Sequence, residues 1–510
     1  MRVELDTAAP AVVACDLLAV PFTGRAPSAF RGVANDARER LDALAAGASA
    51  EPGSISLFTP LPGDGVAAAR VALVGTGAGA AADVEAVRLA AAAAVRSAAS
   101  HGGTVAWAYD PRLKLDPASQ VRGVVEGALL AGYDAARWKT TARKPAVDLL
   151  VVAGAPRRLA AVAERAETLA RWTNQARDLV DAPPNEMTPA GLADAAHALL
   201  EPLQVGVETL DLPAIEELGM GGLAAVGRGS GNEPRLIVAR TGPGAPDLAL
   251  VGKGVTFDSG GYFLKGQGDI VKMKADMAGG AAVLAAVGAI AELGLPLTVL
   301  GVVPAAENAI DGSAFRPGDI LRTASGLTVE ITNPDAEGRL LLADGIWFAL
   351  REGASRVIDV ATLTGATRGA LGDRYIAVFA NEDAWRQRLV DAGEAAGDWA
   401  WPMPLHQGYH RLLDSRLADL RNTSGRSFGY AIIAAAFIER FAGSSTWAHL
   451  DIHSSAYLDE ERDYFSPGAT GAGVRLLVEL ASGVAAESSS AVKPNRGEVG
   501  RRVGRQRRRP

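Results

Sequence analysis

The segment "DLALVGKGVTFDSGGYFLK", residues 247–265, joins an apolar run to a polar, glycine-rich turn. A short apolar run bounded by turn residues is typical of a buried strand. Asp258 lies in the turn, five residues after Lys253 and seven residues before Lys265. Ion pairing at the protein surface is the ordinary explanation of such neighbours and stabilises a fold little. The rest of the chain decides whether these three residues form a site.

Two further apolar runs, at 296–308 and 355–366, resemble strands that end in polar or glycine-rich segments. Helical stretches at 276–293 and 339–352 separate the runs. This alternation predicts an α/β domain with a central mixed sheet covered by helices. In such sheets ligands bind beyond the carboxyl ends of the strands, where Asp258 is expected to lie.

The N-terminal part shows the same alternation on a smaller scale. Strands are predicted at 70–77, 103–109 and 146–154, with a helix at 82–99. Residues 75–80, "GTGAGA", match a dinucleotide-binding pattern. No convincing acidic partner follows at the end of a later strand, so a plain glycine-rich turn is the preferred interpretation.

The sequence therefore predicts an α/β protein with a smaller N-terminal and a larger C-terminal domain. A long charged helical stretch ends at "DAPPNEMTP", residues 181–189, where consecutive prolines cannot continue a helix. We predict an N-terminal α/β domain at 1–155, a linker helix at 156–182, a catalytic domain at 183–481 and a disordered basic tail at 482–510.

Composition and charge exclude several classes of protein. The chain has 510 residues, 48% of them hydrophobic, and one cysteine, Cys15, which rules out an internal disulfide framework. No window reaches the run of about 18 apolar residues that a membrane span needs, so we expect no membrane segment and a cytoplasmic location. Residues 491–510 hold eight basic residues and one acidic residue, a charge of +7 against −7 for the whole chain, which leaves −14 for residues 1–490. An acidic body argues against a nucleic-acid partner.

Four carboxylates lie in the polar segments that follow or precede the predicted elements. Asp258 follows a strand, Asp276 opens a helix, and Asp335 and Glu337 lie in "NPDAEGRLL", residues 333–341. Residues two apart in an extended segment point to the same side, so Asp335 and Glu337 can face one point. Carboxylates that crowd together need protons or cations between them, and a metal ion is the usual solution.

The polar segments resemble the motifs of the leucyl aminopeptidase family, which consists of cytosolic two-metal exopeptidases. The resemblance covers about residues 157–480 and rests on ordered segments, which are "ARDLVDAPPNEMTP" (176–189), "VGKGVTFDSGG" (251–261), "KMKADMAGGAA" (272–282), "NPDAEGRLLLADG" (333–345), "DVATLTGA" (359–366) and "WAHLDI" (447–452).

The resemblance implies a ligand set for two divalent ions, Mn²⁺ or Zn²⁺. Asp258 and Glu337 would bridge the two ions, Asp335 would bind one ion, and Lys253 and Asp276 would bind the other. Lys253 would be neutral, because an amine binds a metal only when it is deprotonated.

The resemblance also implies the catalytic groups. Lys265 matches the family's catalytic lysine, which donates to the oxygen that gains charge in the tetrahedral intermediate. Arg339 matches the arginine that holds a bicarbonate, which carries the proton. The attacking group would be a hydroxide that bridges the two ions.

Substrates implied by the resemblance are short peptides with a free N-terminus, cleaved by a homo-hexamer. The family's substrate-contacting positions form an apolar pocket for a leucine-like first residue, and they correspond here to Met273, Thr362, Leu363 and Gly365. Three bulkier residues near these positions leave the preference for the first residue open, namely Phe428, Tyr430 and His453.

Two other classes of protein remain as alternatives. One is a non-catalytic regulatory or nucleic-acid-binding protein on the same scaffold, and the other is a different two-metal hydrolase such as a phosphatase. Every ligand and catalytic position is present, which disfavours the first. "LVGKGVT" lacks the upstream glycine and the following Ser or Thr of a phosphate-binding loop, which disfavours the second.

Overall fold

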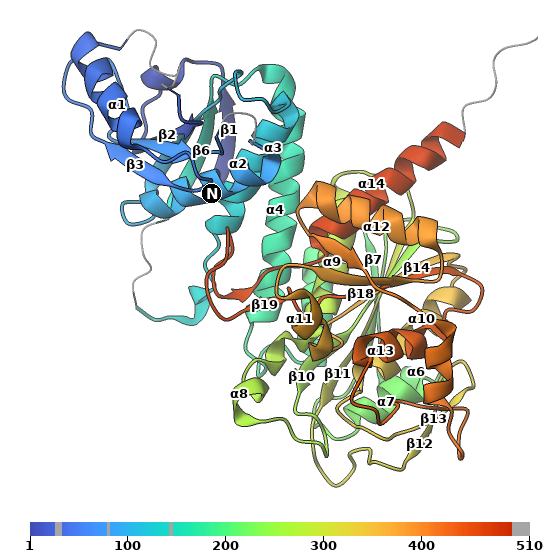
Figure 1. Ribbon diagram of the computed structural model, residues 1–510. Helices are drawn as coiled ribbons and strands as arrows, with labels where there is room; N and C mark the ends of the chain where they lie inside the picture. The colour runs from blue at the N-terminus through green and yellow to red at the C-terminus, as the bar shows by residue number, and fades with distance from the viewer. Residues whose placement is uncertain (26–32, 79–81, 142–145, 492–510) are drawn as a thin grey trace, which may run out of the picture.

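Two mixed β-sheets, each with helices on both faces, organise the chain in the computed structural model (Figure 1). The structure describes residues 1–25, 33–78, 82–141 and 146–491. The architecture is therefore the α/β fold with a smaller N-terminal and a larger C-terminal domain that the sequence predicts.

The N-terminal domain is built on a six-stranded sheet with the order β1-β6-β5-β2-β4-β3. Only the edge strand β3 runs antiparallel to its neighbour, β4. The strands and helices of this domain are β1 (Arg2–Asp6), β2 (Leu17–Phe22), α1 (Asn35–Gly47), β3 (Ile55–Phe58), β4 (Val71–Gly75), α2 (Val84–Ala98), β5 (Gly103–Ala108), α3 (Pro117–Ala131) and β6 (Val147–Ala153).

The C-terminal domain is built on a nine-stranded sheet with the order β16-β15-β18-β14-β9-β11-β8-β7, and β10 pairs with the end of β11. The central strands β18, β14, β9 and β11 are parallel. The strands of this sheet are β7 (Gly206–Leu210), β8 (Arg235–Arg240), β9 (Leu248–Gly252), β10 (Gly254–Asp258), β11 (Val299–Asn308), β14 (Arg356–Ala361), β15 (Ile376–Ala380), β16 (Ala400–Pro402) and β18 (Thr446–Asp451).

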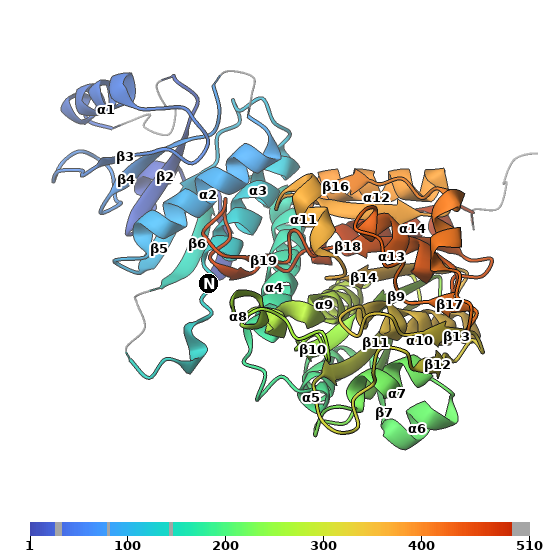
Figure 2. The ribbon, with the colours of Figure 1, turned by 60° about the horizontal axis from the view of Figure 1, so that its bottom comes forward.

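Helices and two small sheets complete this domain (Figure 2). The helices are α4 (Ala160–Asp181), α5 (Pro189–Leu200), α6 (Leu212–Glu217), α7 (Gly221–Gly227), α8 (Gln267–Ile270), α9 (Ala278–Glu292), α10 (Gly338–Arg351), α11 (Gly365–Leu371), α12 (Asp383–Ala396), α13 (Tyr430–Glu439) and α14 (Val474–Ala491). The small sheets consist of β12 (Ile320–Arg322), β13 (Thr328–Glu330) and β17 (Leu420–Arg421), and of β19 (Tyr457–Leu458) and β20 (Gly468–Ala469).

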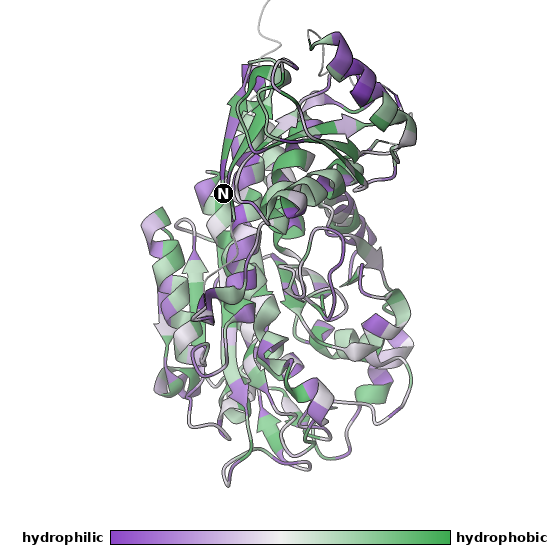
Figure 3. Cartoon of the chain, turned by 90° about the vertical axis from the view of Figure 1, so that its left-hand side faces the viewer, coloured by the Kyte–Doolittle hydropathy of each residue, from purple (hydrophilic) through white to green (hydrophobic). Residues whose placement is uncertain are grey.

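Alternating side chains of the central strands feed two separate cores. Leu248 and Leu250 of β9 pack in the core formed with α4, α5, α9, α12 and α14. Ala249 and Val251 pack in the core on the other face, formed with α7, α10 and α13. Because successive residues of a strand point to opposite faces, a strand buried on both sides has to be apolar throughout. Figure 3 shows this hydrophobic character along the strands.

Helix α4 connects the two domains. Ala163 and Ala166 lie in the N-terminal core, whereas Trp172 and Leu179 of the same helix lie in the C-terminal core. The buried Arg177 donates to the carbonyl of Leu130 in one domain and of Ala469 in the other, both at 2.8 Å. The helix predicted at 156–182 thus belongs to both cores.

One segment, Met273–Glu292, is long and apolar enough by length and composition to cross a membrane. Most of it is buried inside the domain, and α9 packs on β9, β11 and β14. The segment is therefore a core helix, and it is apolar because it is buried on all sides.

The glycine-rich pattern at 75–80 lies between β4 and α2. Its last two residues are outside the described part of the chain. Its interpretation as a plain turn stays a prediction.

The beginning of the basic tail differs from the prediction. Helix α14 runs to Ala491, so residues 482–491 are helical, although we expected disorder from Ser482 onward. Val484 and Ala485 are buried, and Val484 belongs to the main core. Buried apolar contacts offset the entropic cost of ordering this part of the chain. Residues 492–510 lie outside the described part of the chain.

We expect the two parts of the predicted tail to respond differently to truncation. Ending the chain after Ser482 removes the buried Val484 and should lower the free energy of unfolding by about 2–3 kcal/mol, the usual cost of losing a buried aliphatic side chain with its cavity. Ending it after Ala491 should leave the midpoint of thermal unfolding unchanged. Equal midpoints for the two truncated proteins would contradict the packing of α14 described above.

Candidate active site

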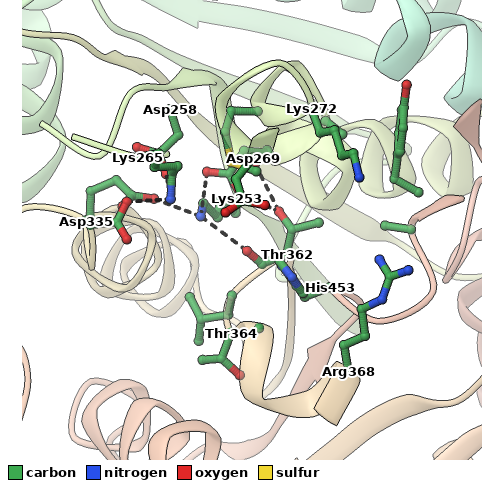
Figure 4. A pocket seen from close by; sticks show the side chains of 18 of the residues that line it. Lys253, Asp258, Lys265, Asp269, Lys272, Asp335, Thr362, Thr364, Arg368 and His453 are labelled. Atoms are coloured by element: carbon green, nitrogen blue, oxygen red, sulfur yellow. Dashed lines mark hydrogen bonds and ion pairs between the residues drawn. The ribbon is translucent and has the colours of Figure 1, made fainter. Parts of the chain in front are cut away.

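The residues predicted to form the site meet at the carboxyl ends of the central parallel strands. Lys253 follows β9, Asp258 ends β10, and Thr362 follows β14. They line one cavity of about 700 Å³ together with Asp276, Asp335, Glu337 and Arg339. Figure 4 shows several of these side chains pointing toward one another. The topology therefore gathers residues from four separate segments of the chain at one edge of the sheet.

Lys253 sits where the chain leaves β9 and shifts into β10. Its backbone N–H donates to the carbonyl of Val360 at 3.0 Å, and its carbonyl accepts from Gly280 at 2.7 Å. A Cβ atom at Gly338 would lie 2.5 Å from Cε and 2.7 Å from Nζ of Lys253. The absence of a side chain at Gly338 is thus what leaves room for the lysine.

Each of the two lysines lies between two carboxylates. Lys253 Nζ is 2.8 Å from Asp276 Oδ2 and 2.8 Å from Glu337 Oε1. Lys265 Nζ is 2.8 Å from Asp258 Oδ2 and also pairs with Asp335. Most of these charged groups are buried, namely Lys253, Asp258, Asp276 and Glu337. These contacts are therefore buried ion pairs, unlike the weak surface pairs that usually account for neighbouring lysine and aspartate residues.

The carboxylates form a candidate metal cluster. Ligand oxygens of Asp258, Asp335 and Glu337 all lie within 4.8 Å of one another. Asp276 is outside this group of three but shares Lys253 with Glu337. The buried Glu337 Oε2 has no hydrogen-bond partner among the described residues. Buried oxygens without partners are costly, and an oxygen-rich set of this kind suits divalent cations, so the residues fit metal ions.

The pKa values reflect competition among these charges. Burial and the neighbouring Glu337 raise the pKa of Asp258 to about 6. Burial also raises the pKa of Asp276 well above its usual value. Burial acts in the same direction on Glu337, but Lys253 and Lys265 outweigh it, so the pKa of this carboxyl is lowered. The cluster as a whole attracts positive charge.

Both lysines are stabilised as cations in this arrangement. Burial lowers the pKa of Lys253, but the carboxylates of Asp276 and Glu337 outweigh it and raise the pKa above its usual value. The same balance, with Asp258 as the main partner, raises the pKa of Lys265. A dication between these carboxylates would oppose the charge on Lys253, which is the condition under which an amine can bind a metal.

Two residues that sequence reasoning missed hold the site in place. Asn308, the last residue of β11, donates from Nδ2 to Asp258 Oδ1 at 2.8 Å and to the carbonyl of Pro334 at 3.2 Å. Asp451, the last residue of β18, accepts from the N–H of Leu363 and from the hydroxyl of Thr364. Both end a central strand and both are polar, which is the signal that could have found them.

Arg339 is buried at the start of α10. Its Nη1 donates to the carbonyl of Asn422 at 2.6 Å, whereas its Nε has no partner among the described residues. Burial lowers its pKa to about 10. A buried guanidinium with an unused donor is a candidate site for a small anion.

The predicted substrate-contacting residues lie on the wall of the same cavity. Met273, Thr362, Leu363 and Gly365 all line it. Of the three bulkier residues, Tyr430 and His453 line the cavity, whereas Phe428 is exposed and is not among the described residues that do so. Burial lowers the pKa of His453.

Known proteins match both domains of the chain. Family models describe residues 38–142 as the N-terminal domain and residues 174–478 as the catalytic domain of the cytosol aminopeptidase family. Probable cytosol aminopeptidases of Roseiflexus castenholzii and Solibacter usitatus are 44% and 40% identical. The first match covers 82% of this chain and 88% of the relative, and the second covers 94% and 99%.

A solved structure is also similar. The bottromycin maturation enzyme BotP in complex with Mn is 37% identical and superimposes with a TM-score of 0.83, over 92% of this chain and 100% of BotP. The two family models and the relatives matched over most of their length show that the chain belongs to the peptidase M17, or cytosol aminopeptidase, family.

Proposed function

We propose that this enzyme is a metal-dependent exopeptidase that releases the first amino acid from peptides with a free N-terminus. The observation that carries the proposal is the crowding of four carboxylates and two lysines at one edge of the sheet, with Glu337 Oε2 unpartnered among the described residues. Such a cluster is stable only with further positive charge. The complex of BotP with Mn supports a divalent metal as that charge.

The ligand set has five members. Asp258 and Glu337 would bridge two ions, Asp335 would serve one ion, and Asp276 with Lys253 would serve the other. The ions, Mn²⁺ or Zn²⁺, would supply Lewis-acid activation of water and of the scissile carbonyl. Asn308 would fix the orientation of Asp258, as hydrogen-bonded residues behind a metal ligand commonly do.

Lys265 and Arg339 would act on the reacting peptide bond. Lys265 is 17% exposed and reaches the cavity, so its ammonium can donate to the carbonyl oxygen that gains charge during attack. Arg339 would hold a bicarbonate through its unused Nε, and the bicarbonate would accept and return a proton. Asn422 would keep the guanidinium in place through its carbonyl.

The pocket for the first side chain would lie between Met273 and the segment from Thr362 to Gly365. The apolar Met273 and Leu363 fit a leucine-like side chain. Substrates would be short peptides in the cytoplasm.

The proposed metal ligands can be tested by substitution. Asp276→Ala and Glu337→Ala should each lose bound metal and activity together, because each removes a charged ligand. The measurement is metal content after dialysis, beside the metal-dependent release of amino acid from aminoacyl anilides. Lys139→Ala, which changes an exposed lysine outside the cavity, serves as the control. Wild-type metal content in both ligand variants would refute the assignment.

The two lysines should fail in different ways. Lys265→Ala should keep its metal and lose kcat by about 10²–10³, the typical effect of removing an oxyanion-stabilising donor. Lys253→Ala should bind one metal ion more weakly. Titration of the apoprotein with Mn²⁺ separates these outcomes, and identical metal occupancy in the two variants would show that the lysines do not have separate roles.

We also expect a homo-hexamer, by analogy with the family alone. Light scattering at micromolar concentration measures the assembly directly. A monomeric mass would exclude this part of the proposal.

A further inference from the structure

Beyond the carboxylate cluster, the same cavity has an outer wall with a different charge pattern. This outer wall consists of Lys272, Gly365, Arg368, His453 and Asp459. Figure 4 shows Lys272, Arg368 and His453 on the side of the cavity away from Asp258 and Asp335. None of the outer-wall residues belongs to the proposed metal ligands.

Arg368 adjoins the predicted position of the first side chain. It lies three residues after Gly365 on α11, so the two residues share one face of the helix. His453 lies beside the same glycine, because its Nε2 is 3.6 Å from the place a Cβ atom of Gly365 would occupy. A substrate side chain that reaches Gly365 would therefore pass close to both residues.

The cations of the outer wall outnumber the carboxylate that pairs them. Lys272 Nζ is 2.6 Å from Asp459 Oδ1, whereas Arg368 Nη2 is 3.6 Å from Asp459 Oδ2. The second distance is too long for a hydrogen bond, and a guanidinium has five N–H donors to satisfy. Arg368 makes no side-chain hydrogen bond to the described part of the chain, and 46% of its side chain is exposed.

A further acidic residue of the cavity wall, Asp269, forms no ion pair with Arg368 among the described residues. Asp269 lies on α8, on a different element from Arg368, and is exposed. It has no ion pair among the described residues. Among the described residues Arg368 therefore pairs with Asp459 and not with Asp269.

Resting on the function proposed above, we propose that Arg368 lets the pocket also accept peptides whose first residue is acidic, glutamate or aspartate, beside the leucine-like residues that Met273 and Leu363 fit. A carboxylate can pair with the guanidinium through two parallel hydrogen bonds, which are among the strongest in proteins. A leucine side chain offers no acceptor to the guanidinium, so its binding would depend on the apolar Met273 and Leu363 and not on Arg368. Asp459 would hold Lys272 and Arg368 together and weaken their attraction for the substrate.

The test compares glutamyl, aspartyl and leucyl anilides with the Mn²⁺-loaded full chain and three variants. Arg368→Met removes the cation and keeps most of the volume. Asp459→Asn removes the competing carboxylate. Arg386→Met is the matched control, because Arg386 pairs with Asp383 on α12 and does not line the cavity.

The ratio of glutamyl to leucyl kcat/KM is the main readout. It should fall at least tenfold in Arg368→Met, rise several-fold in Asp459→Asn and stay constant in Arg386→Met. A ratio that does not change in Arg368→Met overturns the proposal, even when all anilides are cleaved.

Calorimetric titration with free L-glutamate and L-leucine gives a second readout that does not need turnover. Arg368→Met should weaken the binding of glutamate at least tenfold and leave the affinity for leucine unchanged. An unchanged affinity for glutamate, or an equal loss for both amino acids, overturns the inference. Absence of cleavage of every anilide would refute the proposed peptidase function instead, and the titration would still decide the role of Arg368.

Discussion

Mutual repulsion of buried carboxylates is the constraint on which the catalytic half of the molecule depends. Asp258, Asp276 and Glu337 are almost fully buried, where charges are poorly solvated and repel strongly. Lys253 and Lys265 each lie between two of the carboxylates and reduce this cost. The absence of a side chain at Gly338 leaves room for Lys253, which lies between β9 and β10. The backbone beside the carboxylate cluster thus leaves space for the lysines that offset its charge.

The two apolar cores hold the strands rigidly enough to keep the mutually repelling carboxylates in place. Strands such as β9 are buried on both faces, so their carboxyl ends are fixed relative to one another. A cluster assembled from several segments requires this rigidity, because small displacements change the distances among its carboxylates. Helix α4, which belongs to the cores of both domains, ties the N-terminal domain to the same frame.

Much of the fold could be predicted because the runs at 247–254, 296–308 and 355–366 are apolar for a physical reason, burial on both faces of a sheet. The strand order could not be predicted, since pairings such as β11 with the antiparallel β8 depend on contacts distant in sequence. The two-residue spacing of Asp335 and Glu337 predicted that their carboxylates face one point, and their oxygens do lie close together.

Other parts of the site and fold were outside the reach of sequence patterns. The support that Asn308 gives to Asp258 was missed, because a lone asparagine at a strand end acquires meaning only when β10 pairs with β11. The extent of α14 was also missed. Its serine-rich end resembles a linker in composition, whereas the buried Val484 packs on distant parts of the core.

The cavity combines two opposite charge arrangements, and this contrast constrains the substrate. In the inner part each lysine is shared by two carboxylates, so the cluster lacks positive charge. In the outer wall one carboxylate, Asp459, is shared by two cations, so the wall lacks negative charge. Divalent ions would offset the deficit of the inner part and hold the amino end of a peptide there, while a carboxylate of the same peptide would offset the deficit of the outer wall. The separation of the two deficits on opposite sides of one cavity would therefore orient such a peptide before any bond is broken.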